Sequence, residues 1–261
     1  MTDFKIKHFP KTRIATNDVC AIGLQKHHIT AMIEIDVSES REKIKQHRKK
    51  GDKISFTAWL IKVISTTIKD YDSVAAYLQG KRKVIIFNNI NVSIAVEKDL
   101  NGQKIPIPLI IEKADERSIE SITQQINEAK DQILTGNDIV LHSKSNRLER
   151  FYYALPGFIR RSFWHYLLRH PHYAFSKMGN VAITSVGMIG RINGWFIPIS
   201  VHPVCFGIGK VSKKPVVIND KIEIREILNI TVLIDHDVVD GGLMARFINN
   251  LVDNIEKGKE L

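Results

Sequence analysis

His236 and Asp240 are four residues apart and follow an apolar run, "LNITVLI", that ends at Ile234. A histidine just past a buried strand can have one ring nitrogen held by a local acceptor while the other faces a cleft, which is the geometry that a general base requires. Asp240 stands directly before Gly241 and could orient such a site, or it could cap a helix that begins there, because aspartate accepts hydrogen bonds from free helical N–H groups. The spacing therefore indicates a candidate base at position 236, and it also fits a histidine that only lies where a strand ends.

No second set of residues suggests a metal site or a disulfide. Cys20 and Cys205 are far apart in the sequence and belong to no Cys-x-x-Cys or Cys/His metal spacing. The stretch "HYLLRHPHY" holds three histidines, but no carboxylate or cysteine set accompanies them. We therefore expect no bound metal, and we expect both cysteines to be ordinary packing residues.

The composition is that of a basic globular protein. The 261 residues are 44% hydrophobic and carry a formal net charge of +10. This charge would suit an acidic partner such as nucleic acid, a membrane surface or a phosphorylated cofactor. No zinc-finger, recognition-helix or RNA-binding signature accompanies it, so we do not expect nucleic acid. Charge or Pro10 interrupts each apolar run near the N-terminus, which is not typical of a secretory signal, and we expect a cytoplasmic protein.

Strands and helices alternate along the chain without a Pro/Gly/Ser-rich linker or an internal repeat, which favours a single α/β domain. Ser55 and Asp115 are the expected N-caps of two helices, and Asn219-Asp220 is the expected turn of a hairpin. From the hydrophobic periodicity, the expected strands are 29–37, 83–99, 104–115 and several between 181 and 234, and the expected helices are 38–51, 55–71, the stretch after 115 and the stretch after 240.

Residues 144–177 interrupt this alternation with a segment that is both basic and aromatic. Such a segment can lie in a membrane interface or bind an anionic partner, or it can form a helical hairpin that packs its aromatic residues on the domain or on a second subunit. It is too interrupted by charge to span a bilayer. Against the single acid Glu149, the basic residues are Lys144, Arg147, Arg150, Arg160, Arg161, Arg169 and Lys177, and the aromatic ones are Phe151, Tyr152, Tyr153, Phe158, Phe163, Trp164, Tyr166, Tyr173 and Phe175.

The run "DHDVVDGGLMARFINNL" around His236 resembles the His-x-x-x-Asp-Gly signature of the acyltransferase catalytic domain of 2-oxo acid dehydrogenase complexes, and more distantly the same signature in chloramphenicol acetyltransferase. Other segments are similar to this family in the same order, namely "HHITAMIEIDV", "ISFTAWLIKVI", "INVSIAVEKD", "KIPIPLIIEKAD", "AITSVGMIG" and "PVCFGIGKVSKKPVV". The resemblance covers roughly residues 11–139 and 179–257. It implies a chloramphenicol-acetyltransferase-like two-layer α/β sandwich with a mixed sheet, assembled as a homotrimer with each active site between neighbouring subunits.

The resemblance also implies a mechanism. The motif histidine, here His236, is the general base; a thiol has a pKa near ~8.5, so an imidazole that takes its proton raises the fraction of nucleophilic thiolate. The oxyanion that forms when the thiolate adds to the thioester needs a donor, and the family places a serine hydroxyl there. The aligned residue is Thr184, with Ser185 beside it, and loss of such a donor typically costs ~3 kcal/mol. The aligned Gly187 and Gly190 favour this role, although threonine is also an ordinary strand residue.

Asp240 matches the motif aspartate, which in the family mainly holds the backbone of the site and a nearby arginine in place. Gly241 follows it, and Arg13 falls near the family's arginine, so an Asp240–Arg13 ion pair is a hypothesis. Asp237 departs from the family, which usually has arginine directly after the histidine. Its negative charge would raise the pKa of the imidazole by favouring the protonated form, which makes a poorer base at neutral pH.

We therefore expect one acyltransferase catalytic domain over residues 1–261, with a basic aromatic insertion at about 140–178 and without a lipoyl or subunit-binding domain. Coenzyme A is the expected acyl carrier, with no binding residues assigned, and a dihydrolipoyl group would be supplied in trans by another polypeptide. The alternatives are acyl transfer to a hydroxyl or amine of a small molecule or lipid, and a non-catalytic trimeric scaffold. Trimers could assemble into a larger cage, and the insertion could dock the enzyme on a membrane or on a carrier protein.

Overall fold

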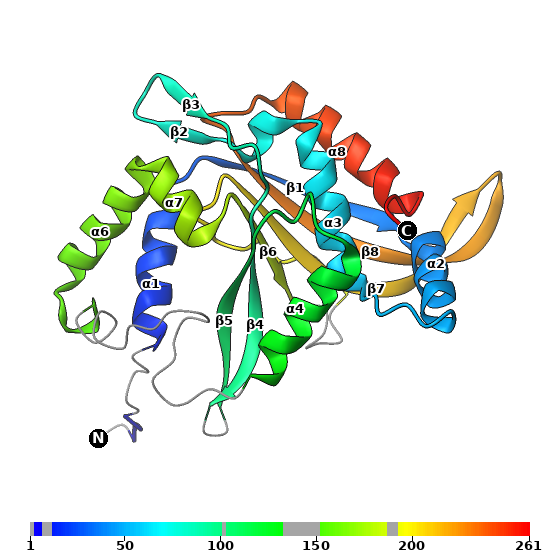
Figure 1. The fold of residues 1–261 in the computed structure, drawn as a ribbon, viewed down its shortest axis with the longest axis horizontal. Helices are drawn as coiled ribbons and strands as arrows, with labels where there is room; N and C mark the ends of the chain where they lie inside the picture. Colours follow the sequence, from blue (N-terminus) through cyan, green and yellow to red (C-terminus); the bar gives the residue numbers. More distant parts are fainter. Residues whose placement is uncertain (1–2, 7–11, 101–102, 133–151, 187–192) are drawn as a thin grey trace.

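One large mixed sheet organises the protein. The computed structural model describes residues 3–6, 12–100, 103–132, 152–186 and 193–261 (Figure 1). The strand order is β1-β8-β7-β6-β4-β5, in which β6 runs parallel to both neighbours and the other pairs are antiparallel. The predicted α/β class and mixed sheet are confirmed. The strands are β1 (His28–Asp36), β4 (Val92–Leu100), β5 (Gln103–Ile111), β6 (Val181–Ser185), β7 (Val204–Ile218) and β8 (Lys221–Asp235).

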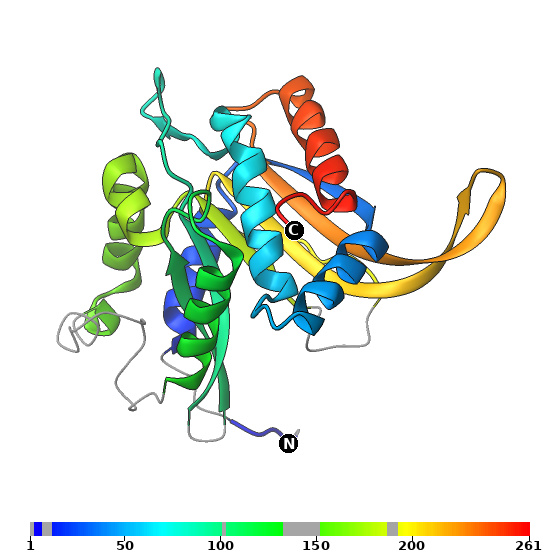
Figure 2. The same cartoon turned by 45° about the vertical axis from the view of Figure 1, so that its right-hand side comes forward.

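Four helices cover one face of this sheet (Figures 1 and 2). Alternate residues of β8, Ile230, Val232 and Ile234, belong to the buried cluster under these helices, together with the fully buried rings of Trp59 and Phe247. The sheet and its helical layer form the predicted two-layer sandwich. The helices are α2 (Ser38–Lys49), α3 (Phe56–Lys69), α4 (Ile119–Asp131) and α8 (Gly241–Glu256).

A strap of chain, residues 193–200, crosses the opposite face of the sheet, which we call the strap face. The strap lies directly on β7, since a Cβ atom at Gly207 would come within 3.0 Å of the Phe196 carbonyl oxygen. A Cβ atom at Gly209 would come within 3.1 Å of the Gly194 carbonyl oxygen. Glycine at these two positions therefore permits the strap to lie against the sheet.

Two local sequence signals are confirmed by the backbone geometry. The Ser55 hydroxyl accepts a hydrogen bond from the Ala58 N–H at 3.1 Å and caps α3. Asn219 and Asp220 form the two-residue turn between β7 and β8, with φ angles of 49° and 62°. A two-residue hairpin turn needs such positive φ angles, which asparagine and aspartate tolerate better than most residues.

The predicted cap at Asp115 is wrong. Helix α4 begins later, and the Ser118 hydroxyl accepts from the Ser121 N–H at its N-terminus. The Asp115 carboxylate is buried and accepts instead from the Ile90 N–H at 2.9 Å, and it forms an ion pair with Lys69 at 3.4 Å. Its role is therefore to fasten the chain that leads into β4.

Three further helices lie together beside the sheet (Figure 1): α1 (Thr12–Gly23), α6 (Gly157–Arg169) and α7 (Pro171–Met178). The buried carboxylate of Asp18 in α1 accepts from Arg160 Nε at 2.6 Å and from the Tyr152 hydroxyl at 2.9 Å. The described part of the basic aromatic segment is thus a helical pair that packs on the domain. Its residues 144–151 lie outside the described residues.

A short hairpin of β2 (Tyr77–Gln79) and β3 (Lys83–Ile85) projects next to α7. A 3-10 helix, η1 (Asp72–Ala75), joins this hairpin to α3. Among the described residues, no helix combines the length and the hydrophobicity that crossing a membrane requires.

Candidate active site

His236 is the first residue after β8. Its backbone N–H donates to the carbonyl oxygen of His27 at 2.9 Å, so the residue after the C-terminal end of β8 is hydrogen-bonded to the residue that precedes β1. The side chain is exposed, and within the described part of the chain the imidazole has no hydrogen-bond partner. The predicted position of this histidine after a buried strand is confirmed. The acceptor expected for one ring nitrogen is not found among the described residues, and the catalytic role stays a prediction.

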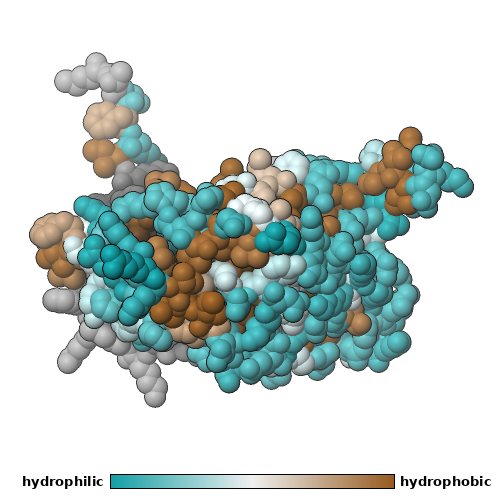
Figure 3. Space-filling model, turned by 90° about the horizontal axis from the view of Figure 1, so that it is seen from above, coloured by the Kyte–Doolittle hydropathy of each residue, from teal (hydrophilic) through white to brown (hydrophobic). Residues whose placement is uncertain are grey.

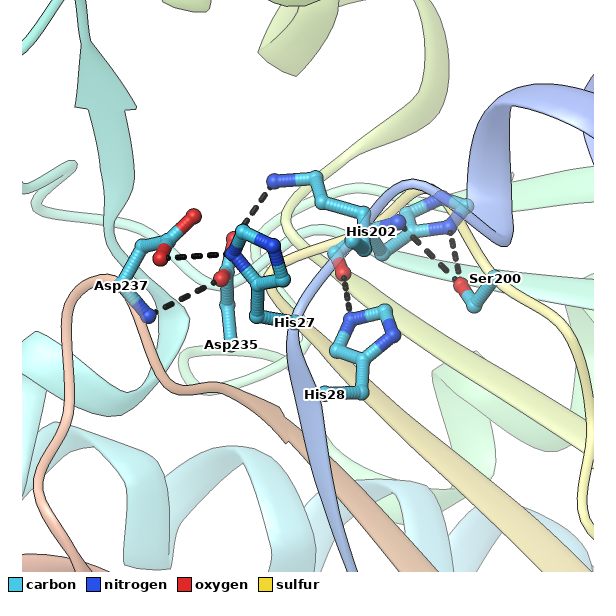
Figure 4. Close-up of polar contacts among 7 residues, drawn as sticks. His27, His28, Ser200, His202, Asp235 and Asp237 are labelled. Atoms are coloured by element: carbon cyan, nitrogen blue, oxygen red, sulfur yellow. Dashed lines mark hydrogen bonds and ion pairs between the residues drawn. The ribbon is translucent and has the colours of Figure 1, made fainter.

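Asp235, the last residue of β8, is held on both carboxylate oxygens. Lys26 Nζ donates to Oδ2 at 2.5 Å, and the side chains of Lys26 and Asp235 are 18% and 3% exposed. The backbone N–H of Asp237 donates to Oδ1 at 3.2 Å (Figure 4). A buried ion pair of this kind fixes the peptide on both sides of His236.

The Asp237 carboxylate is hydrogen-bonded to a histidine other than His236. The carboxylate accepts this hydrogen bond from His27 Nδ1 at 2.9 Å, and it points to this ring in Figure 4. The bond to Asp237, followed by the charge of the same carboxylate, raises the pKa of His27. The Asp237 carboxylate therefore has a hydrogen-bond partner other than the candidate base.

Two more histidines form a hydrogen-bonded chain behind this site. His28 Nε2 donates to the carbonyl oxygen of His202 at 3.0 Å, and His202 Nε2 donates to that of Met178 at 3.0 Å. The Ser200 hydroxyl lies 3.1 Å from His202 Nδ1 (Figure 4). Burial lowers the pKa of His28 and lowers that of His202 to about 4. His202 is therefore a neutral imidazole that donates through Nε2 and accepts through Nδ1.

Sequence reasoning missed Lys26, His27, His28 and His202. The signal for the first three is their place at the start of the strand that pairs with β8. Lys26 and His27 precede β1, and His28 is its first residue, opposite Asp235 in the register. Two antiparallel strands bring the residue before one strand next to the residue after the other. The sequence gives no such indication for His202, which lies two residues after the strap.

Thr184 lies on the strap face of β6, because its neighbours Val181 and Ile183 point into the core under the helices. It is half-buried, and among the described residues its hydroxyl has no hydrogen-bond partner. Ser185 points the other way, so the two hydroxyls serve different faces of the sheet. Ser185 lines a hollow of about 280 Å³ together with Arg41, Phe56 and Lys210.

Within one chain, Thr184 and His236 cannot meet. Thr184 is paired with Gly207, and Gly207 is paired with Thr231, which lies five residues before His236. With a rise of about 3.3 Å per residue and a strand spacing of about 4.8 Å, the two backbones are roughly 19 Å apart. Two side chains do not span that distance. A site that uses both groups needs two copies of the chain.

Asp240 is the N-cap of α8, because its Oδ1 accepts from the Leu243 N–H at 2.7 Å. The described residues contain no ion pair between Asp240 and Arg13, which is exposed on α1. A Cβ atom at Gly241 would meet nothing within 4 Å, so a single chain gives no steric reason for this glycine. Gly187 and Gly190 lie outside the described residues.

Neither cysteine belongs to a reactive cluster. Both thiols are free, Cys205 is buried, and burial raises the pKa of its thiol to about 12. In the described ranges, no group of three or more His, Cys, Asp or Glu side chains is placed to hold a metal ion.

The catalytic-domain model of the 2-oxoacid dehydrogenases acyltransferase family matches residues 23–138 and 175–261. Two curated relatives are the dihydrolipoyllysine-residue acetyltransferase components of the pyruvate dehydrogenase complex of Staphylococcus epidermidis and Staphylococcus aureus, which are 25% and 24% identical over 235 residues. This alignment covers 86% of the chain but only 44% and 45% of the two relatives. The chain thus spans less than half the length of these proteins.

Solved structures show the same fold. A probable dihydrolipoamide acetyltransferase from Listeria monocytogenes has a TM-score of 0.69 and 21% identity, covering 98% of this chain and 95% of its own. The dihydrolipoamide acetyltransferase of Azotobacter vinelandii, studied for the role of one serine, one histidine and one asparagine in its mechanism, has a TM-score of 0.68 and 17% identity over 97% and 92% of the two chains. Chloramphenicol acetyltransferase has a TM-score of 0.53 and 11% identity over 97% and 98%.

Proposed function

Because the chain belongs to the 2-oxoacid dehydrogenases acyltransferase (catalytic domain) family, we propose that it transfers an acyl group between coenzyme A and a thiol. The thiol of this proposal is that of a dihydrolipoyl group, and the reaction takes place in the cytoplasm. The active unit is a homotrimer with one active site at each subunit boundary.

The observation that carries the proposal is the spacing of three residues. In the Azotobacter vinelandii enzyme, the serine and the histidine studied for their catalytic role are 52 positions apart, and the asparagine follows the histidine by four. Thr184 and His236 are also 52 positions apart, and Asp240 also follows by four. The order hydroxyl, imidazole and polar residue is the same in both chains. This agreement supports Thr184 as the oxyanion donor and His236 as the base.

Each of these groups has a defined chemical task. The exposed His236 imidazole takes the proton of the attacking thiol, and the thiolate adds to the carbonyl carbon of the thioester. The Thr184 hydroxyl of the adjacent copy donates to the oxyanion of the tetrahedral intermediate. Collapse of the intermediate expels the second thiolate, which takes the proton back from the imidazolium. Asp240 positions the chain after the base by capping α8.

The strap face supports an assembly of several copies. Met32, Ile197 and Ile199 are 57%, 59% and 46% exposed although they are large and apolar. Thr184 lies on the same face, so a second copy that covers these side chains would also close the site around the hydroxyl. The likeness to the cubic core of a pyruvate dehydrogenase multienzyme complex, with a TM-score of 0.67 and 18% identity, supports further assembly of such trimers into a cage.

The test follows thiol release from acetyl-coenzyme A with dihydrolipoamide and with a panel of alcohols and amines. We expect His236→Ala to lower the rate by roughly 10²–10⁴. Thr184→Ala should lower it by roughly 10²–10³, and the control Thr184→Ser should retain most of it. Release with an alcohol or amine alone would give the enzyme another acceptor. If none of these acceptors led to thiol release, the protein would be a scaffold, and the proposal would be contradicted.

Mixed trimers test the shared site separately. His236→Ala subunits keep the hydroxyl and Thr184→Ala subunits keep the imidazole, so co-expression of the two inactive forms should regenerate roughly one intact site in four if neighbours share a site. The recovered rate should approach a quarter of the native rate. If each chain contained its own complete site, mixing would restore nothing.

A further inference from the structure

Helix α6 carries a second apolar stripe that its packing does not use. One side of the helix, with Trp164, Leu167 and Leu168, packs in a small cluster with Tyr77. The other side is a stripe at helical spacing that faces solvent. It comprises Ile159, Phe163, Tyr166 and His170, of which Phe163 and Tyr166 are 43% and 55% exposed.

This stripe continues onto α7 and onto the short β2–β3 hairpin. A hollow of about 470 Å³ is lined by Phe163, Tyr166 and His170 of the stripe, His172 and Tyr173 of α7, and Gln79 of β2. Val84 in the hairpin and Ile86 after it are 47% and 44% exposed. We call the surface formed by the exposed residues of α6, α7 and residues 79–86 the basic aromatic face. In the view from above, hydrophobic residues reach the surface beside strongly hydrophilic ones (Figure 3).

The charges of this face have one sign. Its exposed cations are free of ion pairs within the described residues, unlike Arg160, which is bound to Asp18. The sequence has no aspartate or glutamate between positions 73 and 96 or between 151 and 219. The described segments that form this face, 79–86 and 157–178, therefore contribute cations and apolar rings but no carboxylate. The cations are Lys81, Arg82, Lys83, Arg161, Arg169 and Lys177.

The face is held in place from behind. The Asp18 carboxylate fixes α6 through Arg160 and Tyr152, and the buried Tyr77 hydroxyl donates to the carbonyl oxygen of Gly179 after α7. These bonds occupy the inner side of the helical pair, so the exposed rings do not complete the core of their own domain. They are available to something outside it.

We propose that the basic aromatic face binds an anionic phospholipid surface. Rings at the depth of the headgroups and cations beside the lipid phosphates are the two components of interfacial binding. In protein–protein interfaces, lysine is depleted relative to the rest of the protein surface. Here three of the six cations are lysines, and Lys177 Nζ lies 5.8 Å from the centre of the Tyr173 ring. This mixture favours a lipid surface over an acidic protein.

The experiment is co-sedimentation of the full chain with phosphatidylcholine vesicles, with or without phosphatidylglycerol. We expect binding only to the anionic vesicles, with loss at high salt because exposed charges are screened. The triple variant Lys81→Gln, Arg82→Gln, Lys83→Gln should bind roughly a hundredfold more weakly. The double variant Phe163→Ser, Tyr166→Ser should bind at least roughly tenfold more weakly, because two rings no longer enter the interface.

The matched control removes three exposed cations elsewhere and should bind like the native chain. Its substitutions are Lys49→Gln, Lys50→Gln and Lys53→Gln, at the end of α2 and away from the hairpin (Figure 1). All variants should keep the native circular dichroism spectrum and acyl transfer, since they change exposed side chains only.

Four results would overturn the proposal. They are no binding to anionic vesicles, equal binding to phosphatidylcholine alone, equal losses in the control and the hairpin variant, and binding to polyglutamate in place of vesicles. The last would assign the face to an acidic protein. A changed oligomeric state of the variants, measured by light scattering, together with no vesicle binding, would assign it to a second copy of the chain.

Discussion

Removal of Lys26 should destabilise the protein more than removal of any exposed lysine. In Lys26→Met the Asp235 carboxylate loses its charged partner while remaining 3% exposed. Breaking a buried ion pair from one side costs about 3–5 kcal/mol, and because Lys26 itself is 18% exposed, water reduces the loss to the lower end, about 3 kcal/mol. At about 2.1 cal/mol/K per residue, a chain of this length has an unfolding entropy near 0.55 kcal/mol/K. The expected drop in Tm is therefore about 5 °C.

The measurement is urea unfolding followed by far-UV circular dichroism, at one protein concentration because assembly adds to stability. Asp235→Asn and the double variant complete a cycle that isolates the pair. The double variant should lose less than the sum of the two single losses, because it leaves no unpaired charge.

Lys257→Met is the control, because its ion pair with Asp253 at 3.2 Å has side chains that are 74% and 63% exposed. An exposed pair of this kind is worth about 0–1 kcal/mol. If Lys26→Met lost no more than this control, or if the losses in the cycle were additive, the buried pair would not hold the chain beside His236 and our reasoning about the site would fail.

Three further outcomes follow from single contacts. The pKa of His202 is lowered to about 4 in the folded chain, so between pH 6.5 and pH 4 the unfolded chain binds a proton that the folded chain does not. The unfolding free energy should therefore fall by about 2–3 kcal/mol from pH 6.5 to pH 4. His202→Gln should make this pH dependence flatter. Asp240→Ala should cost about 1 kcal/mol in urea unfolding through loss of the α8 cap, whereas Asp240→Asn should retain it. Gly179→Ala should lower Tm strongly, because φ is +72° and the new Cβ would lie within 2.3 Å of the Asn91 carbonyl oxygen; Gly258→Ala, with φ +65° but a flexible lysine as neighbour, should lower it less.

The predictable part of the fold is the part that local patterns determine. The helix after Ser55 and the hairpin at Asn219 follow from hydrophobic periodicity, a capping hydroxyl and a turn dipeptide, all of which lie within a few residues of one another. Helix α1 was not expected, because its buried residues include Asp18, and a sequence does not show which aspartate will be buried by a distant arginine.

The same limit applies to the candidate site. The position of His236 after a buried strand could be predicted, since the apolar run of β8 marks it. Its surroundings could not, because Lys26 meets Asp235 across 209 residues and His27 meets Asp237 across 210. The hydrogen bond between His27 and Asp237 could not be predicted, because it depends on how β1 and β8 pair.

Gly207 and Gly209 lie under the strap, where any larger residue would change how the strap lies on the sheet. A single methyl group at Gly207 would press on the Phe196 carbonyl oxygen and on the ring of Pro198, and would lift the strap from the sheet. If copies of the chain meet on the strap face as proposed, such a variant should lose activity although Thr184 and His236 are both unchanged. A measurement of molar mass would then distinguish a loss of assembly from the loss of a reacting group.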